Sequence, residues 1–326
     1  MLLCQERATC LEGIRAESDT TREGTAFMEI TFHADDFGIT VAESQGILDL
    51  SSVAGGSGLL SSLSIFANSS FFPLCADLLD PHFENLKVAV HVNLTEGHCC
   101  ADPEDVPLLV NHFGCFDKSF YRLTRLSVGR GADEFNRQLR REIAAQIDVV
   151  TQRFPALRHR LRVDGHQHVQ LIPAVFDAIL DIVRDEGYTL DYLRIPCEPV
   201  EPFLRCPSLY HTYRPINWLK QRVLNHYWRR DAPKFPSYQT KSALFCGVLL
   251  SGHMDRARLE LILPHYVRVA EERGMNLEVL LHPCVVEHRN MCLDPSADDF
   301  VKFYLSPDRK TEAETLRTLS MPRFGI

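Results

Sequence analysis

The chain has 326 residues, of which 45% are hydrophobic and 24% charged, and its formal net charge at pH 7 is -8. This composition is close to that of an average globular protein, so the chain can bury a large core without disulfides or a structural metal. The net negative charge, without long clusters of Lys and Arg, argues against nucleic acid or an anionic membrane as a partner. No run approaches the roughly 18 apolar residues that a membrane helix needs, so the sequence predicts a soluble protein.

Residues 1–27 are polar, lack periodicity and contain several charged side chains. They predict a disordered extension and exclude a secretory signal. The eleven cysteines are scattered, with no Cys-x-x-Cys pair, a pattern typical of reduced thiols in the cytoplasm. We therefore expect a cytoplasmic protein with one domain over residues 28–326, and leave open whether it forms homo-oligomers.

From Met28 onward, strand-like and helix-like runs alternate along the chain. Strands are predicted at residues 28–32, 59–66, 86–92, 161–163, 190–195, 243–249 and 277–281. Helices are predicted at 41–50, 72–79, 133–150 with Asp133 as the N-cap, 173–184, 255–273 and 311–319. The proline-rich segment 196–240 interrupts this rhythm and is predicted to be an insertion that covers one face. Repeated βα units favour parallel strands with helices outside, either as an open doubly wound sheet or as a barrel.

The unusual polar residues come at the carboxyl ends of the predicted strands. They are Asp35, Asp36, His91, Asp164, His166, Arg194 and His282. In parallel α/β folds these strand ends open onto one common face, where loops from several strands build the site. Residues far apart in the sequence are therefore expected to lie together.

Asp35 and Asp36 have a simple alternative explanation, because a turn that caps the next helix would use one Asp. Such a turn does not explain the second Asp. Adjacent carboxylates point in different directions, so one can bind a metal while the other acts as a base. His91 alone would more often be a core residue, but the two histidines beside Asp164 are a fair metal signal. One Asp and two His from three strand ends indicate a metal site with open positions for water and substrate.

Three motifs stand in order along the chain: HADDFG at 33–38, HVNLTEG at 91–97 and DGHQHV at 164–169. Together they resemble the YdjC-like carbohydrate deacetylases, the family that includes chitooligosaccharide deacetylases. Weaker support comes from Arg-Ile-Pro at 194–196, His-Pro at 282–283 and the segment 306–316 with Arg309 and Glu314. The resemblance covers residues 28 to 320.

The resemblance implies a distorted (β/α) barrel of the glycoside hydrolase/deacetylase type that removes acetyl groups from an N-acetylated sugar or oligosaccharide. It assigns a divalent cation, magnesium in the family, to Asp36, His91 and His166. Asp35 then matches the catalytic base, and His282 matches the residue that protonates the leaving amine. His168 is a second candidate for that proton. His168, Arg194 and Asn93 are predicted to contact the substrate.

Ligand chemistry and family precedent differ over the metal. Two imidazoles favour zinc or another transition ion, whereas magnesium prefers oxygen ligands, so Zn²⁺ is the alternative to Mg²⁺. The sequence also departs from the family pattern at His33, Gln170 and Cys284, where the family has Asn or Thr, His, and Gly. None of these changes removes a ligand. Gln170 and Cys284 affect the expected substrate contacts and loop shape, because glycine allows backbone conformations that cysteine resists.

Three other functions are considered. A phosphoesterase would need more basic residues near the strand ends than Arg194 supplies. A glycosidase would use Asp35 and Asp36, but sequence neighbours at one strand end do not straddle a glycosidic bond. A catalytically silent sugar-binding protein on the same fold would not need all of the predicted site residues. Trp218, Tyr227 and Trp228 either stack on a sugar or pack in a helix, and packing is the more common use of such residues.

Overall fold

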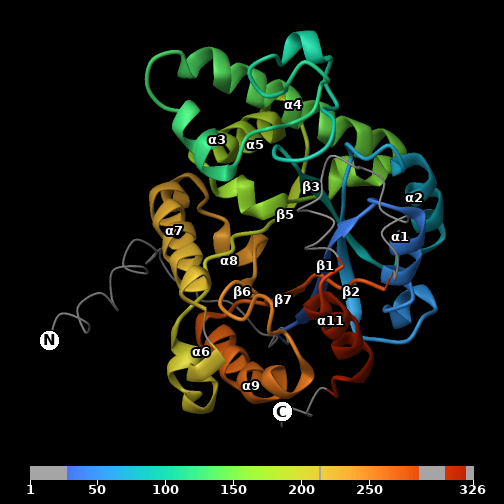
Figure 1. Ribbon diagram of the computed structural model, residues 1–326, viewed down its shortest axis with the longest axis vertical. Coiled ribbons are helices and arrows are strands. Elements are labelled where there is room, and N and C mark those ends of the chain that lie inside the picture. Colours follow the sequence, from blue (N-terminus) through green and yellow to red (C-terminus); the bar gives the residue numbers. More distant parts are fainter. Residues whose placement is uncertain (1–27, 213, 286–304, 321–326) are drawn as a thin grey trace, which may run out of the picture.

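Seven parallel strands form one curled sheet in the computed structural model, which describes residues 28–212, 214–285 and 305–320 (Figure 1). The strands are β1 (Ile30–Phe37), β2 (Leu60–Ile65), β3 (Lys87–Val92), β4 (Leu161–Gly165), β5 (Leu190–Leu193), β6 (Leu244–Cys246) and β7 (Leu277–Leu281). Their order is β5-β4-β3-β2-β1-β7-β6, and within the described residues β5 and β6 are not paired to each other. The sheet is therefore an open half-barrel, which confirms the predicted α/β fold with a distorted barrel. The predicted extension at 1–27 lies outside the described residues.

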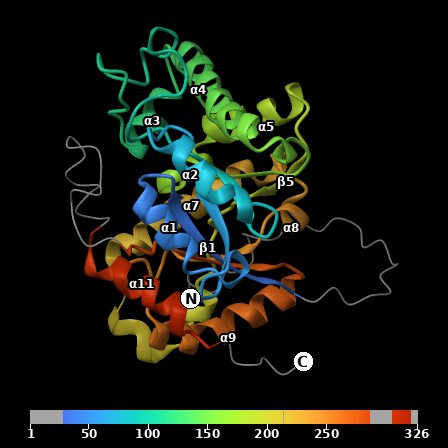
Figure 2. The same ribbon diagram turned by 90° about the vertical axis from the view of Figure 1, so that its right-hand side faces the viewer.

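Helices pack around the outside of this sheet (Figures 1 and 2). They are α1 (Val41–Leu48), α2 (Phe72–Leu79), α3 (Phe120–Leu126), α4 (Ala132–Arg153), α5 (Pro173–Asp185), α6 (Glu201–Leu204), α7 (Pro215–Asp231), α8 (Tyr238–Lys241), α9 (Arg256–Arg273) and α11 (Pro307–Thr318). Short 3₁₀ helices are η2 (Ser52–Ala54), η3 (Asp80–His82), η4 (Pro103–Asp105), η5 (Pro155–His159), η6 (His166–Leu171), η7 (Pro207–Thr212) and η8 (Ala232–Lys234). Helix α1 contacts β1, α4 contacts β3, and α9 contacts β6 and β7. The apolar core lies between these helices and the sheet.

Several element boundaries differ from the predicted ones. Strand β1 runs to Phe37 instead of residue 32, so Asp35 and Asp36 are its last polar residues. Helix α4 begins after Gly131, whose φ of 83° only glycine adopts easily, and Asp133 lies inside the first turn instead of at the N-cap. Helix α11 begins at Pro307, a residue type suited to the first turn. Helix α3 lies in a stretch for which no helix or strand was predicted.

The segment between β5 and β6 is helical and contains α6, η7, α7, η8 and α8. Helix α7 contacts η6, the turn that follows β4. That residues 196–240 are an insertion remains a prediction. Among the described residues, no helix is long and apolar enough to cross a membrane. Among the described cysteines, the free thiols include those of Cys75, Cys99, Cys100, Cys206 and Cys246.

The concave face of the sheet carries polar side chains at alternating positions. Buried polar residues at strand positions two apart are His33 and Asp35 in β1, and Ser62 and Ser64 in β2. Successive side chains of a strand point to opposite faces, so each pair shares one face. A barrel of this class usually fills its interior with branched apolar residues. Here a network of buried charges lies beneath the carboxyl ends of the strands, and that network positions the site.

Candidate active site

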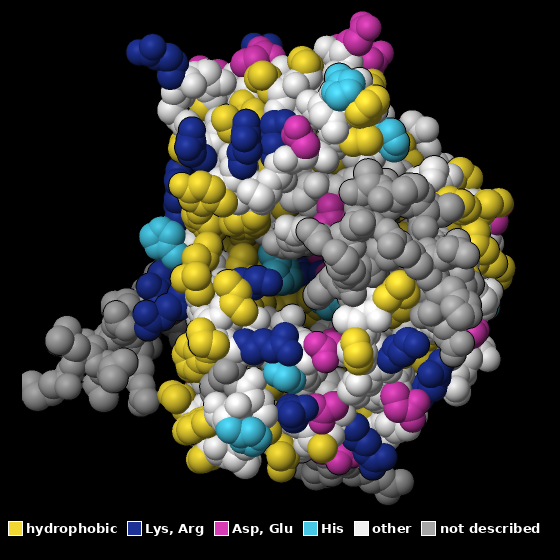
Figure 3. All heavy atoms as spheres, viewed as in Figure 1, with side chains coloured by type: hydrophobic (Ala, Val, Ile, Leu, Met, Phe, Trp, Pro, Cys, Tyr) yellow, Lys and Arg dark blue, Asp and Glu magenta, His cyan; other side chains and the backbone are white. Residues whose placement is uncertain are grey.

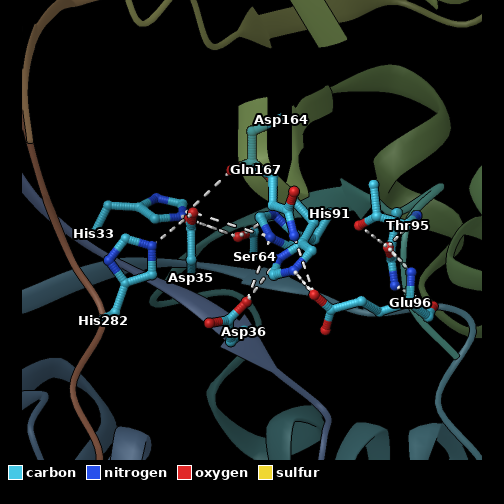
Figure 4. Close-up of polar contacts among 12 residues, drawn as sticks. His33, Asp35, Asp36, Ser64, His91, Thr95, Glu96, Asp164, Gln167 and His282 are labelled. Atoms are coloured by element: carbon cyan, nitrogen blue, oxygen red, sulfur yellow. Dashed lines mark hydrogen bonds and ion pairs between the residues drawn. The ribbon is translucent and has the colours of Figure 1, made fainter. Parts of the chain in front are cut away.

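Three predicted ligands converge at the carboxyl ends of β1, β3 and β4. Asp36, His91 and His166 are buried, and one ligand atom from each lies within 4.8 Å of the other two. The Oδ1 atom of Asp36 is 3.2 Å from His166 Nδ1 and 3.6 Å from His91 Nε2. Figure 4 shows Asp36 and His91 facing each other across this point. The structure thus brings together the three residues that the motifs selected.

Both the spacing and the unused atoms of this group fit a metal ion. Zinc lies about 2.0–2.2 Å from nitrogen and oxygen ligands, which places neighbouring ligand atoms roughly 3.0–3.5 Å apart. Within the described residues, Asp36 Oδ1 and His91 Nε2 are buried and make no hydrogen bond. Buried polar atoms normally have a partner, so two such atoms aimed at one point fit a cation between them.

The backbone adopts unusual conformations where it presents two of these ligands. Asp36 has a φ of 69°, a left-handed conformation that costs a residue with a side chain roughly 1–2 kcal/mol. After His166, both Gln167 and His168 have positive φ, so the chain turns sharply within η6. Gly165 precedes this turn, and a Cβ there would lie 2.7 Å from Gln170 Oε1. Such strain is kept where the surrounding structure fixes a functional geometry.

His91 is oriented by a carboxylate behind it. Its Nδ1 donates a hydrogen bond of 2.6 Å to Asp164 Oδ1, so in the neutral imidazole the lone pair lies on Nε2, toward Asp36. A carboxylate–histidine pair of this kind usually sets the tautomer of a metal ligand. Burial lowers the pKa of His91, but Asp35 and Asp164 outweigh it and raise the pKa to about 10. In the same way, Asp36 and Glu96 outweigh burial and raise the pKa of His166 to about 9.

Asp35 has a different set of partners from its neighbour Asp36. Its Oδ1 accepts hydrogen bonds from Arg194, at 2.8 Å, and from Ser64, at 3.1 Å, and it lies 3.2 Å from His33 Nε2. Burial raises the pKa of Asp35, but Arg194, His91 and His33 together hold it well below the usual range. Asp35 is therefore an ionised carboxylate that is held in place. In Figure 4 it lies between His33 and His282 on one side and Ser64 on the other.

Arg194 is fully buried at the centre of three carboxylates. Its guanidinium lies 2.8 Å from Asp35, 3.0 Å from Asp164 and 2.6 Å from Glu278. His33, Asp35 and Asp164 also lie close enough together to form a second group with the spacing of metal ligands. The guanidinium already supplies a positive charge there. The side chain of Arg194 has no solvent exposure, so its charge is balanced inside the protein.

His282 completes the group around Asp35. Its Nε2 lies 3.7 Å from Asp35 Oδ2, and the side chain is 24% exposed. Burial, assisted by the positive charges of Arg309 and Arg194, lowers the pKa of His282 to about 4. The backbone N–H of His282 donates to Glu312 of α11. Figure 3 shows histidine side chains at the bottom of a hollow, with hydrophobic side chains along its left edge.

The three predicted substrate contacts lie in different surroundings. The Nδ1 atom of His168 is buried and has no hydrogen bond within the described residues. Burial and the charge of Arg194 lower the pKa of His168 to about 3, so its imidazole is neutral at pH 7. Asn93 accepts hydrogen bonds from the N–H groups of Thr95 and Glu96 and donates to the carbonyl of Glu96, which fixes its own loop. Arg194 faces the three carboxylates.

Some residues of the site were missed or only partly recognised from sequence. Glu278 of β7 accepts from Arg194 and from Tyr192, both at 2.6 Å. In α11, Glu314 is exposed, whereas Glu312 is the buried residue that contacts the strand end. A single carboxylate within an otherwise apolar strand was the signal available for Glu278. Helical spacing from Arg309 was the signal available for Glu312.

Comparison with known proteins places this architecture in a family. The model for the family described as "YdjC-like protein" matches residues 29–324. The chain belongs to the YdjC-like family. One solved structure, described as a putative cellobiose-phosphate cleavage protein from Enterococcus faecalis, covers 89% of this chain with a TM-score of 0.59 and 20% identity. At that identity the likeness shows the fold alone.

Curated relatives of this YdjC-like chain carry deacetylase names. A carbohydrate deacetylase of Danio rerio is 28% identical over 174 residues, which span 53% of this chain and 51% of that protein. A chitooligosaccharide deacetylase of Yersinia pestis is 27% identical over 262 residues, or 79% of this chain and 83% of that protein. The chain thus spans about half the length of the fish relative and most of the bacterial one.

Proposed function

We propose that this protein is a metal-dependent carbohydrate N-deacetylase, a hydrolase that removes acetyl groups from an amino-sugar or oligosaccharide. One observation carries the proposal. The adjacent carboxylates of Asp35 and Asp36 have different sets of partners: Asp36 lies beside His91 and His166, whereas Asp35 lies beside Arg194 and His282 and is slightly farther than Asp36 from His91. One carboxylate is therefore available as a metal ligand and the other as a base. The names of the curated relatives support the same reaction class.

The residues that would hold the cation are Asp36, His91 and His166. When bound, a divalent cation supplies Lewis acidity to the acetamide carbonyl and lowers the pKa of the attacking water. Two nitrogens and one oxygen suit zinc, and the family resemblance implies magnesium. Metal analysis of protein purified without chelator distinguishes the two.

Asp35 takes the proton of the attacking water. It is suited to this because Arg194 and Ser64 hold one of its oxygens, Oδ1, while Oδ2 faces the open side of the site near His282. Its lowered pKa keeps it ionised at neutral pH. Positioning of an ionised base beside its proton donor contributes about 10²- to 10⁴-fold in rate.

The departing nitrogen needs a proton, because an amine anion is a poor leaving group. His282 is neutral at pH 7, and its Nε2 lies 3.7 Å from Asp35 Oδ2. The proton that Asp35 gains can pass to His282 Nε2 and from there to the leaving nitrogen. The Nδ1 of His168, which has no hydrogen bond to any described residue, then remains as a polar contact for the sugar or its acetyl group.

Release of acetate from N-acetylglucosamine oligomers, by apo protein and by protein reloaded with Mg²⁺ or Zn²⁺, tests this proposal. Asp35→Asn should lower kcat about 10²- to 10⁴-fold and leave metal binding intact. The matched control is Asp49→Asn, at an exposed carboxylate just after α1, which should keep full activity. Lack of acetate from every acetylated sugar tried with reloaded protein, or cleavage of p-nitrophenyl phosphate instead, would reject the proposal.

A further inference from the structure

The two oxygens of the Asp36 carboxylate face different positively charged side chains. Its Oδ1 faces His91 and His166, as described above. Its Oδ2 accepts two hydrogen bonds from Arg309, from both terminal nitrogens of the guanidinium at 3.1 Å. Each oxygen of the carboxylate thus has a separate set of partners.

Arg309 reaches Asp36 from a distant part of the sequence and is itself fixed. It lies in the first turn of α11, and its side chain is 2% exposed. Its carbonyl accepts a hydrogen bond of 3.2 Å from the N–H of Cys284, just after β7. One turn further along α11, Glu312 accepts from the N–H of His282. Two contacts between α11 and the end of β7 therefore hold the guanidinium against Asp36.

A guanidinium beside a metal ligand has two opposing effects. Its positive charge repels a bound cation, which weakens binding. Its hydrogen bonds also orient the carboxylate, and loss of such an orienting partner typically weakens metal binding 10- to 100-fold. Orientation should dominate here, because Arg309 contacts the oxygen that faces away from the two imidazoles, and Asp36 has a strained backbone that alone would not fix its side chain.

We propose that Arg309 is a positioning residue for the metal, which holds Oδ2 of Asp36 so that only Oδ1 is available to the cation. The inference rests on the proposed metal site. A carboxylate that binds through one oxygen gives three protein donor atoms in all. Further coordination positions then stay open for water and for the acetyl oxygen of the substrate. Without Arg309, Asp36 is free to turn and bind through both oxygens.

Titration of the apo protein with CoCl₂ tests this inference, because Co²⁺ reports both affinity and coordination through its visible absorption. Arg309→Met should raise the dissociation constant for Co²⁺ about 10- to 100-fold and change the absorption bands. Arg309→Lys keeps one charged donor and should give an intermediate value. Arg317→Met is the matched control, since Arg317 lies on the same helix but is exposed, and it should bind Co²⁺ like the wild type.

The outcomes separate this inference from the proposed deacetylase activity. A Co²⁺ dissociation constant for Arg309→Met that is equal to or below that of the wild type, with unchanged absorption, overturns the role of Arg309. If that variant does not fold, as judged by circular dichroism, a wild-type dissociation constant for Arg309→Lys does the same. A wild type that binds no Co²⁺ also overturns it. Weakened Co²⁺ binding in the variants of a protein that releases no acetate supports the inference and rejects only the deacetylase.

Discussion

His91 Nδ1 donates a hydrogen bond of 2.6 Å to Asp164 Oδ1, and the two residues are partners in the register of β3 and β4. Strand pairing therefore fixes both the position and the tautomer of the histidine. Because Asp164 accepts the proton on Nδ1, the opposite nitrogen is the one that faces the proposed metal site. The backbone of the sheet thus determines the chemistry of a side chain.

Asp164→Asn should weaken metal binding about 10- to 100-fold, because an Asn can present its amide N–H₂ to His91 Nδ1 and favour the wrong tautomer. Isothermal titration calorimetry with Zn²⁺ measures the change. Asp191→Asn provides a control, since Asp191 lies on the neighbouring β5 but is exposed and pairs with Arg162. Equal Zn²⁺ affinity in Asp164→Asn and wild type would contradict the role of Asp164.

Metal binding at pH 7 should release about two protons. The pKa of His91 is raised to about 10 and that of His166 to about 9, so both side chains are imidazolium cations at pH 7 before metal binds. A metal ligand must be deprotonated, so apparent affinity should rise with pH until about pH 9–10. Calorimetry in buffers with different ionisation enthalpies counts the protons. A proton count of zero would show that the imidazoles are neutral in the apo protein.

Glu278→Leu should destabilise the protein by about 3–5 kcal/mol, because it leaves the buried guanidinium of Arg194 without one of its three carboxylates. Tyr192→Phe removes a single hydrogen bond to Glu278 and should lower the free energy of unfolding by only about 0.5–1.5 kcal/mol. Equilibrium unfolding in urea measures both. The comparison is Glu272→Gln, at an exposed ion pair with Arg268, which should change stability by less than about 1 kcal/mol. Similar values for Glu278→Leu and Glu272→Gln would refute the network.

Glu198 should make stability depend on pH. It accepts hydrogen bonds from the N–H groups of residues 247–249 and from Tyr266. Burial outweighs these bonds and raises its pKa from 4.5 to about 7. The folded state therefore holds a proton that the unfolded state has lost between pH 4.5 and 7. Across that range the free energy of unfolding should fall by about 3 kcal/mol and then level off.

Other carboxylates titrate in the same range, so the contribution of Glu198 is measured as the difference in free energy of unfolding between the wild type and a Glu198 variant. Urea unfolding of the wild type and of Glu198→Gln is compared at several pH values from 4.5 to 8. The wild type should lose about 3 kcal/mol relative to the variant as pH rises to 7, since Gln does not titrate. A constant difference between the two proteins would disprove the assignment.

The sequence predicted the strands and most helices because apolar runs of strand length are bounded by clear turns. Residues 72–79 and 277–281 form the elements with the predicted boundaries. The end of β1 was predicted five residues early, because His33, Asp35 and Asp36 look like loop residues. They are polar strand residues that line the interior of the half-barrel. The local sequence does not distinguish a polar strand end of this kind from a loop.

The ligand group could be predicted because its members come from short motifs at strand ends. The supporting residues could not, because their roles depend on which side chains share a face. Glu278 lies within an apolar strand, and only the sheet order places it against Arg194 of β5. Glu312 follows Arg309 by three positions and so lies on the same face of α11, whereas Glu314 follows by five and points to solvent.

Helix α11 follows all seven strands in the chain, yet its Arg309 contacts Asp36 at the end of the first strand. On a ribosome, chains emerge and begin to fold from the N-terminus. Asp36, His91 and His166 are therefore synthesised long before Arg309, whose guanidinium contacts one oxygen of Asp36. On the proposed role of Arg309, a nascent chain that meets a metal ion before α11 docks would hold it with an unrestrained Asp36, and docking of α11 would then complete the site.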